Sequence, residues 1–153
     1  MSDHSHDAHC VFCKIVQGTI PSATILETDD AVVILDIHPV NPGHVLIIPK
    51  SHYSMLANVP AESAATMARL LPALCQAIQA ATGAHGYNLI ANNGRAAGQT
   101  VDHVHWHIIP RFHDDAARSP WPQGQYVGDE LGQMQFRIHR ELSLTRRLDF
   151  DPS

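Results

Sequence analysis

The sequence is poor in the features that mark nucleic-acid-binding, membrane and secreted proteins. Its 153 residues carry 10 Lys and Arg against 15 Asp and Glu, a formal net charge of −5, and no basic run is longer than Arg146 and Arg147. Such a balance offers no electrostatic footprint for nucleic acid or an anionic membrane surface. No stretch approaches the ~20 apolar residues of a membrane span, and the N-terminus lacks the basic and apolar parts of a signal peptide. We therefore expect a cytoplasmic protein with a small-molecule partner.

Cysteine is scarce, whereas histidine is unusually frequent. The chain has three cysteines and 12 histidines. Three cysteines are too few for a disulfide framework, and the Cys10-x-x-Cys13 spacing suits metal ligands in a reducing compartment. Cys75 stands in an apolar helical segment and is interpreted as a core residue. Several histidines lie in the leader, residues 1–9, which we interpret as a disordered His-rich tail in preference to a metal-collecting tract.

Length and composition fit one compact domain over residues 10–153. A hydrophobic content of 44% in 153 residues is enough for a single core. Because the strand-like segments near the N-terminus follow one another closely, we expect them to pair in antiparallel fashion. Short runs rich in Val, Ile and Leu, bounded by Asp, Pro and Gly, predict five strands, at 22–28, 31–36, 44–50, 86–92 and 104–110.

One long and two shorter helices are expected beside these strands. Apolar residues at three- and four-residue spacings predict the long helix over 61–82, with Gly83 at its end. Pro72 should bend this helix, because proline lacks the N–H that would bond four residues back. Shorter helices are predicted over 11–18 and around 131–142. The predicted fold class is therefore α+β, a helix-covered antiparallel sheet.

The stretch "HVHWHIIPR", residues 103–111, carries histidine at every second position. Side chains alternate between the two faces of a strand, so His103, His105 and His107 share one face, with about 6.6 Å between neighbours. Three titratable rings among apolar residues are costly to bury without partners. The pattern therefore indicates either a metal site or nucleophilic catalysis.

A glycine-rich loop, "NNGRAAGQT" at 92–100, stands directly before these histidines. Gly94 and Gly98 let backbone N–H groups approach an anion, and Gln99 and Thr100 add side-chain donors. In isolation a plain mobile turn is an equal alternative, but beside three histidines the loop indicates a phosphate cradle. Attack of a neutral imidazole on phosphorus, giving a phosphohistidine that water resolves, is then an economical chemistry.

Together these segments resemble the histidine triad (HIT) family. The alternation His, apolar, His, apolar, His, apolar, apolar is the signature of that family, and residues 103–109 match it throughout. The segments "FCKIVQGTIPS" and "LDIHPVNPGHVLIIPKSH" resemble the family's N-terminal and central blocks, in the same order. The resemblance covers about Cys10 to Arg111 and leaves an extension, 112–153, without a motif. In that extension Trp121 is a candidate to reach an active site across a dimer.

The resemblance implies an enzyme that cleaves AMP-X compounds, such as nucleoside phosphoramidates. His105 matches the nucleophile that takes AMP onto its imidazole, His107 a donor to the phosphoryl oxygens, and His103 a support for the nucleophile. His44 matches a fourth histidine of the site. Asp36 matches the carboxylate that accepts the ribose hydroxyls, although without the resemblance it would be interpreted as a turn residue. The remaining residues implied to bind the purine nucleotide are Asn92, Gln99 and Thr100 near the phosphate and Phe12, Ile15 and Ile34 around the base.

A zinc site is also implied. Cys10 and Cys13 need two further ligands. Some members of the family supply them from a histidine after the "IIPK" strand and from the first triad histidine, which here are His52 and His103. The resulting Cys₂His₂ set is typical of a closed, structural zinc, which would tie the N-terminus to the sheet and orient the catalytic strand. A hydrolytic zinc on all three triad histidines is the alternative, but it leaves both cysteines unexplained.

Two other functions stay open from the sequence. One is a diadenosine polyphosphate hydrolase that forms the same AMP intermediate on His105, and the other is a nucleotide-binding regulatory protein with negligible turnover. Related nucleotidyl transferases carry Gln at the third triad position, where this chain has His107, which favours hydrolysis over transfer. The resemblance further implies a homodimer in which two sheets join edge to edge through the long helix and its neighbouring strand.

Overall fold

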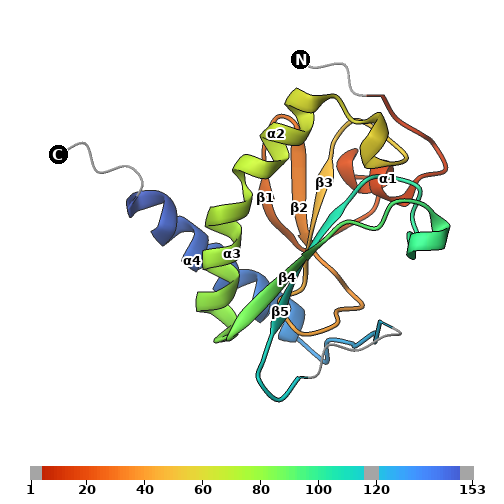
Figure 1. The fold of residues 1–153 in the computed structure, drawn as a ribbon. Helices are drawn as coiled ribbons and strands as arrows, with labels where there is room; N and C mark the ends of the chain where they lie inside the picture. The colour runs from red at the N-terminus through yellow and green to blue at the C-terminus, as the bar shows by residue number, and fades with distance from the viewer. Residues whose placement is uncertain (1–4, 116–120, 149–153) are drawn as a thin grey trace.

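A computed structural model describes residues 5–115 and 121–148, and an antiparallel sheet forms its centre (Figure 1). The strands are β1 (Thr24–Glu27), β2 (Ala31–Leu35), β3 (Val45–Pro49), β4 (Gly86–Ile90) and β5 (Trp106–Arg111). The α-helices are α1 (Val11–Val16), α2 (Ala61–Arg69), α3 (Leu71–Thr82) and α4 (Glu130–Leu148). The strand order is β1-β2-β3-β5-β4, with every neighbouring pair antiparallel, which confirms the predicted five-stranded sheet.

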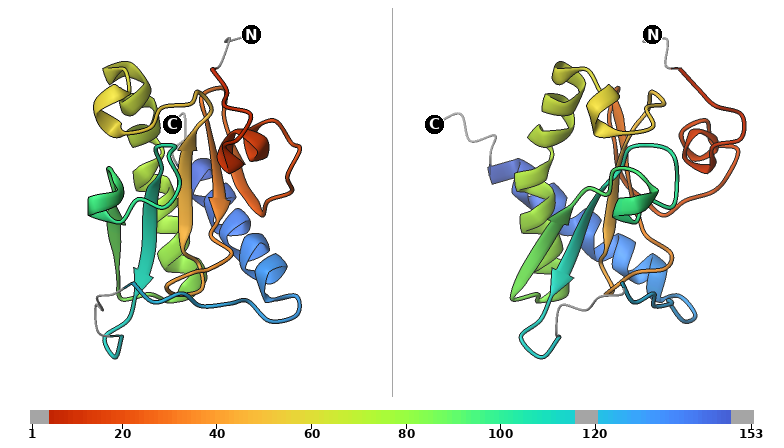
Figure 2. Two further views of the ribbon diagram at one scale, coloured as in Figure 1. Left: turned by 90° about the vertical axis from the view of Figure 1, so that its right-hand side faces the viewer. Right: turned by 45° about the vertical axis from the view of Figure 1, so that its right-hand side comes forward.

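Alternation along the buried strands divides the core into two clusters, one on each face of the sheet. Val33 and Ile47 point towards α3 and α4, whereas the adjacent Ile34 and Leu46 point towards α1. Figure 2 shows α3 and α4 together on one side of the sheet and α1 on the other. Because β2 and β3 are buried on both faces, their sequences are continuously apolar and do not alternate with polar residues.

The predicted long helix is divided in two. Helix α2 ends at Arg69 and α3 begins at Leu71, so the break falls two residues before Pro72. Pro72 has no N–H to donate to the carbonyl of Ala68, four residues back, which interrupts the regular helix. At the break the N–H of Leu70 bonds to the carbonyl of Met67, three residues back. Gly83 ends α3 in the left-handed conformation, at φ 70°, as predicted for the helix terminus.

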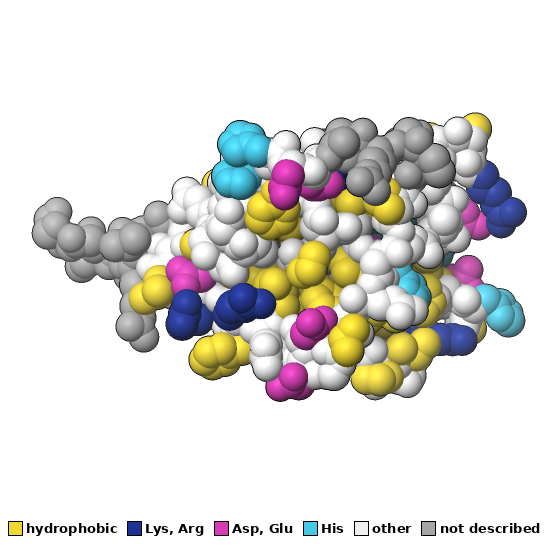
Figure 3. Space-filling view, turned by 90° about the horizontal axis from the view of Figure 1, so that it is seen from below, with side chains coloured by type: hydrophobic (Ala, Val, Ile, Leu, Met, Phe, Trp, Pro, Cys, Tyr) yellow, Lys and Arg dark blue, Asp and Glu magenta, His cyan; other side chains and the backbone are white. Residues whose placement is uncertain are grey.

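The C-terminal helix is the longest element of the fold. Met134, Ile138 and Leu142 lie at four-residue spacing and are buried against α3 and the sheet. Among residues 5–115 and 121–148, no helix is both long and apolar enough to cross a membrane. On the face shown in Figure 3, acidic and basic side chains are interspersed around apolar ones and do not gather by sign.

Part of the N-terminal leader is held against the domain. The backbone N–H of His52 donates to the carbonyl of Ser5 over 2.8 Å, and the Ser5 hydroxyl donates back to the carbonyl of His52. The sequence predicted a disordered tail over residues 1–9, and in the structure Ser5 of that segment has these two hydrogen bonds. Residues 1–4 of that tail lie outside the described part of the chain.

Candidate active site and metal centre

The three alternating histidines lie on the sheet face that α1 covers. Strand β5 begins at Trp106, so His103 and His105 stand just before it and His107 within it. Their side chains are nonetheless all buried. The rings of His105 and His107 have centroids 4.9 Å apart, and the edge of Phe12 lies against His105 at 5.0 Å. The predicted common face is therefore kept, although the strand is shorter than predicted.

His105 is held in one tautomer by the backbone of its neighbour. Its Nδ1 lies 2.7 Å from the carbonyl oxygen of His103, and a carbonyl can only accept, so Nδ1 carries the proton. The lone pair of Nε2 is then available as a nucleophile. Burial lowers the pKa of His105 below its usual value, against the opposing effects of this carbonyl and of Asp36. The ring is therefore neutral at pH 7, as attack requires.

A chain of hydrogen bonds fixes the protons on the next two histidines. The N–H of Val40 donates to Nδ1 of His44 over 3.0 Å, so that nitrogen is unprotonated. In a neutral His44 the proton must then be on Nε2, which lies 2.9 Å from Nδ1 of His107. His107 accepts there, which leaves its own proton on Nε2. The chain thus presents His107 as a fixed donor while the ring stays neutral.

Burial keeps both members of this pair uncharged. Together with a smaller effect of the neighbouring His105, it lowers the pKa of His44 to about 3 and that of His107 to about 3. His44 is 0% exposed and His107 is 8% exposed. A neutral pair is necessary, because a proton added to Nδ1 of His107 would remove the acceptor that His44 donates to.

Asp36, His44 and His107 also place three ligand-type atoms within 4.8 Å of one another. A metal on this group would need the Nε2 lone pair of His44, which would move the ring proton to Nδ1. That position already faces the N–H of Val40. Two donors would then meet, so the geometry favours a hydrogen-bond chain over a second metal site.

Asp36 lies in a turn and also beside the histidine cluster, the two positions that the sequence analysis considered for it. Its Oδ1 accepts the backbone N–H of His38 over 2.9 Å, which shapes the turn after β2. Its Oδ2 lies 3.6 Å from Nε2 of His44. One carboxylate oxygen is therefore structural, and the other stands at the edge of the histidine cluster.

The residues implied to bind the nucleotide are divided by the structure into two groups. Phe12, Ile15 and Ile34 pack together in the apolar cluster beneath α1, next to His105. The other group lies in the glycine-rich loop, where Asn92 is half-buried and Thr100 is exposed. The first group forms an apolar wall and the second a polar rim.

Gln99 has a structural part in that loop. Its Nε2 donates to the carbonyls of Ser54 and Val101, and its Oε1 accepts the N–H of Gly94. The side chain is buried, so these bonds replace water and set the shape of the loop. Gly94 and Gly98 have φ of 85° and 88°, a region that side chains rarely adopt. In this structure Gln99 shapes the cradle and is not a free donor within it.

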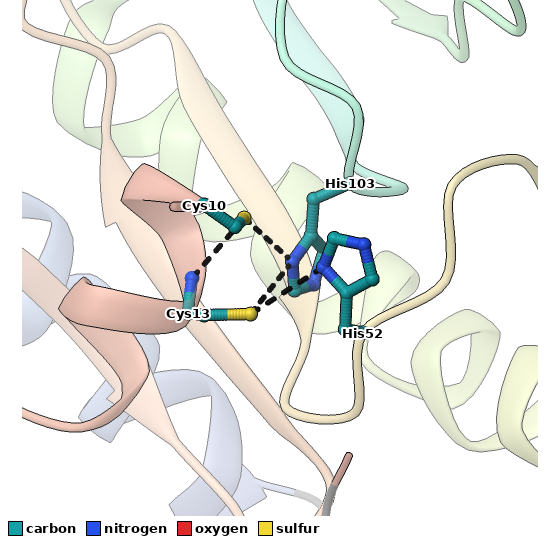
Figure 4. A group of neighbouring side chains, drawn as sticks. All are labelled: Cys10, Cys13, His52 and His103. Atoms are coloured by element: carbon teal, nitrogen blue, oxygen red, sulfur yellow. Dashed lines mark hydrogen bonds between the residues drawn. The ribbon is translucent and has the colours of Figure 1, made fainter. Parts of the chain in front are cut away.

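The four predicted metal ligands converge at one point (Figure 4). The Sγ atoms of Cys10 and Cys13 and the Nδ1 atoms of His52 and His103 all lie within 4.8 Å of one another. Nδ1 of His103 is 3.3 Å from the sulfur of Cys10 and 3.6 Å from that of Cys13, and His52 is 3.4 Å from Cys13. The sequence therefore identified a real cluster from residues far apart in the chain.

These distances fit a tetrahedral ion. With Zn–S of about 2.3 Å and Zn–N of about 2.0–2.1 Å, the sulfur-to-nitrogen edges of a tetrahedron measure roughly 3.5 Å. His103 is also in the tautomer that a ligand needs, because its Nε2 donates to the carbonyl of Pro49 over 2.8 Å and leaves Nδ1 unprotonated. Burial lowers the pKa of His103 to about 4, so the ring is neutral.

Backbone donors complete the surroundings of the two sulfurs. The N–H of Asp7 points at the Sγ of Cys13 from 3.3 Å, and the N–H of Cys13 at the Sγ of Cys10 from 3.4 Å. Such donors stabilise negative charge on sulfur. Without a cation, burial raises the pKa of the Cys13 thiol. The donor set is therefore suited to thiolates only when a positive ion neutralises them.

Trp121, the candidate to reach an active site across a dimer, lies at the histidine cluster of its own chain. Its ring lies 4.8 Å from that of His107 and 5.8 Å from that of His44. No motif in the extension marked this contact. The only signal was a large aromatic residue in a segment otherwise rich in Pro, Gly and Gln.

A comparison with models of known protein families agrees with the fold and the histidine site described above. The HIT domain model matches residues 17–114. The chain belongs to the HIT family.

Named relatives and solved structures extend over most of the chain. It is 47% identical over 134 residues to adenylylsulfatase HINT3 of Arabidopsis thaliana, which is 88% of this chain but 64% of that protein. It is 37% identical over 141 residues to adenosine 5'-monophosphoramidase HNT1 of Candida albicans, 89% of this chain and 93% of that protein. A Zn-bound histidine triad protein from Mycobacterium smegmatis superposes with a TM-score of 0.82 at 33% identity, covering 92% of this chain and 97% of that one. The Cys/His cluster is thus compatible with zinc.

Proposed function

We propose that this protein is a hydrolase that cleaves AMP-X compounds, nucleoside phosphoramidates in particular, through a covalent AMP intermediate on His105. One observation carries the proposal: the carbonyl of His103 holds the proton of His105 on Nδ1 and leaves a neutral Nε2 free in a buried site. Relatives named as an adenylylsulfatase and as adenosine 5'-monophosphoramidases act on AMP-linked substrates by name, which supports the same substrate class here.

The reaction proceeds in two displacements at phosphorus. Nε2 of His105 bonds to phosphorus as the bond from phosphorus to the leaving nitrogen breaks, and that nitrogen takes up a proton. Water then bonds to phosphorus, loses a proton, and the bond to Nε2 breaks to release AMP and the neutral ring. His107 donates from its Nε2 to the phosphoryl oxygens as they gain charge, and one such fixed donor contributes about 3–4 kcal/mol.

The remaining residues bind the nucleotide. The purine base lies against Phe12, Ile15 and Ile34, and the free oxygen of Asp36 accepts the ribose hydroxyls. Asn92 and Thr100 face the phosphate and the leaving group. Gln99 supports this region by holding the loop, in keeping with its three hydrogen bonds to backbone groups. His44 acts through His107.

Mass spectrometry after rapid mixing with an adenosine phosphoramidate tests the proposal. The parent protein is expected to carry a transient AMP adduct, and a His105→Asn variant none. His38→Asn is the matched control, because His38 is exposed on the loop before His44. If the parent forms no adduct but cleaves a diadenosine polyphosphate, the substrate is wrong. If it binds nucleotide and releases no AMP from either compound, the protein is a binding protein and the proposal fails.

The Cys₂His₂ cluster holds zinc in a structural role. Four protein ligands fill a tetrahedral site and leave no position for water, so this ion would support the fold and leave the chemistry to His105. His103 links the two sites, because its Nδ1 faces the cluster and its carbonyl holds the nucleophile. All three cysteines are free of disulfides, two of them as ligands, which suits a reducing compartment and supports a cytoplasmic location.

The protein forms a homodimer through the edge strand β4. Tyr87 and Leu89 on this strand are 43% and 50% exposed, and an unpaired edge of this kind invites a second strand. Light scattering after gel filtration should give a dimer for the parent and a monomer for Leu89→Lys. Leu144→Lys, on the exposed face of α4, is the control and should stay dimeric. A monomeric parent would refute this arrangement.

A further inference from the structure

A short segment after β5 crosses the end of the histidine cluster. We call residues 121–126 the strap. The N–H of Gly124 donates to the carbonyl of Pro39 over 2.7 Å, and the hydroxyl oxygen of Tyr126 accepts the N–H of Gly43 over 3.0 Å. Both hydrogen bonds attach the strap to the loop that leads into His44. A side chain at position 124 has no room, since a Cβ there would lie 2.8 Å from the Pro39 oxygen.

This anchoring places one aromatic ring over the hydrogen-bonded histidine pair. Trp121 meets His107 edge to face at 4.8 Å and lies tilted over His44 at 5.8 Å. It ends a row of four rings, from Phe12 through His105 and His107, whose successive centroids are 5.0, 4.9 and 4.8 Å apart. The indole therefore closes the side of the site opposite Phe12.

The covered bond is sensitive to water. His107 can donate from Nε2 in a fixed direction only while its Nδ1 accepts from His44. Water reaching this pair would offer other partners to both nitrogens and would stabilise an added proton. The titratable groups that face the pair are His105 and Asp36, which act in opposite senses on the proton affinity of His107. Neither His105 nor Asp36 fixes the tautomer of His107. The tautomer therefore depends on keeping water away from the pair, which the rings packed around His107 do.

We propose that Trp121 is a positioning residue, which shields the His44–His107 hydrogen bond and so fixes the proton that His107 offers to the phosphoryl group. The shielding of the bond stands on the ring contacts alone. The kinetic consequence rests on the proposed function. Trp121 acts through His107, and the strap fastens it to the same loop that supplies the N–H of Val40 to His44.

Kinetics of AMP release provide the first test. Trp121→Ala should lower kcat about tenfold, because a donor that is present but no longer fixed loses part of its ~10²–10³-fold contribution. KM should change less than kcat, because the apolar wall for the base lies at the Phe12 end of the ring row, opposite Trp121. Trp121→Phe keeps an aromatic cover and should recover most of the activity. Phe136→Ala, an exposed aromatic on α4 across the sheet, should match the parent.

Nitrogen NMR of the histidine rings provides the second test and needs no turnover. In the parent, His107 should keep its proton on Nε2 without titrating between pH 8 and 5. In Trp121→Ala it should exchange tautomers and titrate within that range. Parent-like tautomers and titration in Trp121→Ala, or the same change in Phe136→Ala, would overturn the proposal. If the ring signals change as expected but the parent releases no AMP, the shielding role holds and the proposed enzymatic function fails.

Discussion

Replacing His44 with leucine should weaken both the fold and the chemistry, although the residue need not touch substrate. Leucine fills a similar space without a nitrogen, so the change removes two hydrogen bonds and opens little cavity. It leaves the N–H of Val40 and Nδ1 of His107 without their partners. An unpaired buried polar group costs about 1–3 kcal/mol. Because the Val40 group is only partly buried, we expect the free energy of unfolding to fall by about 2–4 kcal/mol.

The catalytic loss should be separable from this loss of stability. His107 stays in place in His44→Leu, but nothing selects the tautomer that donates from Nε2. The loss in kcat should therefore be about tenfold to a hundredfold, less than the ~10²–10³ for removal of a whole donor. Urea-induced unfolding and steady-state AMP release, both at pH 7.5, measure the two effects. The control is His38→Leu, on the same loop but exposed. If the two variants agree in unfolding free energy and in kcat, the reasoning about this hydrogen-bond chain is wrong.

Three further predictions concern stability. Chelation of the metal should lower Tm by about 10 °C before activity is lost, because metal binding contributes ~4 kcal/mol and each kcal/mol shifts Tm by ~2–4 °C. Cys13→Ala should lower Tm in the same way, whereas Cys75→Ala should retain its metal in elemental analysis. Burial lowers the pKa of His44 and His107 to about 3, so between that value and ~6.5 the unfolded chain binds more protons than the folded one. The free energy of unfolding should therefore decrease as the pH is lowered through this range, by about 1.4 kcal/mol per pH unit for each ring. Urea titrations at pH 7.5 and 5.5 would contradict this if they gave equal stabilities. Gly124→Ala should destabilise by about 1–3 kcal/mol through its clash, whereas Gly132→Ala, in open space on α4, should stabilise slightly; calorimetry giving the reverse order would contradict the strap geometry.

The parts of the structure that the sequence predicted are those with a local period or a fixed spacing. Strand alternation was enough to put the three triad histidines on one face, and Cys10-x-x-Cys13 identified half of the Cys/His cluster. The family pattern supplied His52 and His103. The antiparallel sheet followed from short apolar runs with turns between them. For the strands and the common face of the triad, the deciding contacts are repeated over neighbouring residues, so a local pattern was enough to predict them.

The features that the sequence did not predict depend on single long-range contacts. The strap contacts a loop some eighty residues earlier in the chain, through a backbone N–H and a tyrosine oxygen that leave no pattern. The tautomer of His107 depends on the N–H of Val40, which every residue but proline would offer. Pro72 was predicted to bend one helix over 61–82, and the structure instead divides that helix between Arg69 and Leu71, in the turn before the proline.

The contact of the leader with His52 has a practical consequence for anyone who prepares this protein. Ser5 is hydrogen-bonded to His52, and the N–H of Asp7 points at the sulfur of Cys13, so residues 5–7 lie beside the Cys/His cluster. A polyhistidine tag fused ahead of these residues would add further imidazoles near the same cluster. Metal content measured on such a preparation would count tag and site together, and nickel carried over from a column could occupy the cluster. A tag at the other end of the chain, removed before analysis, avoids both errors.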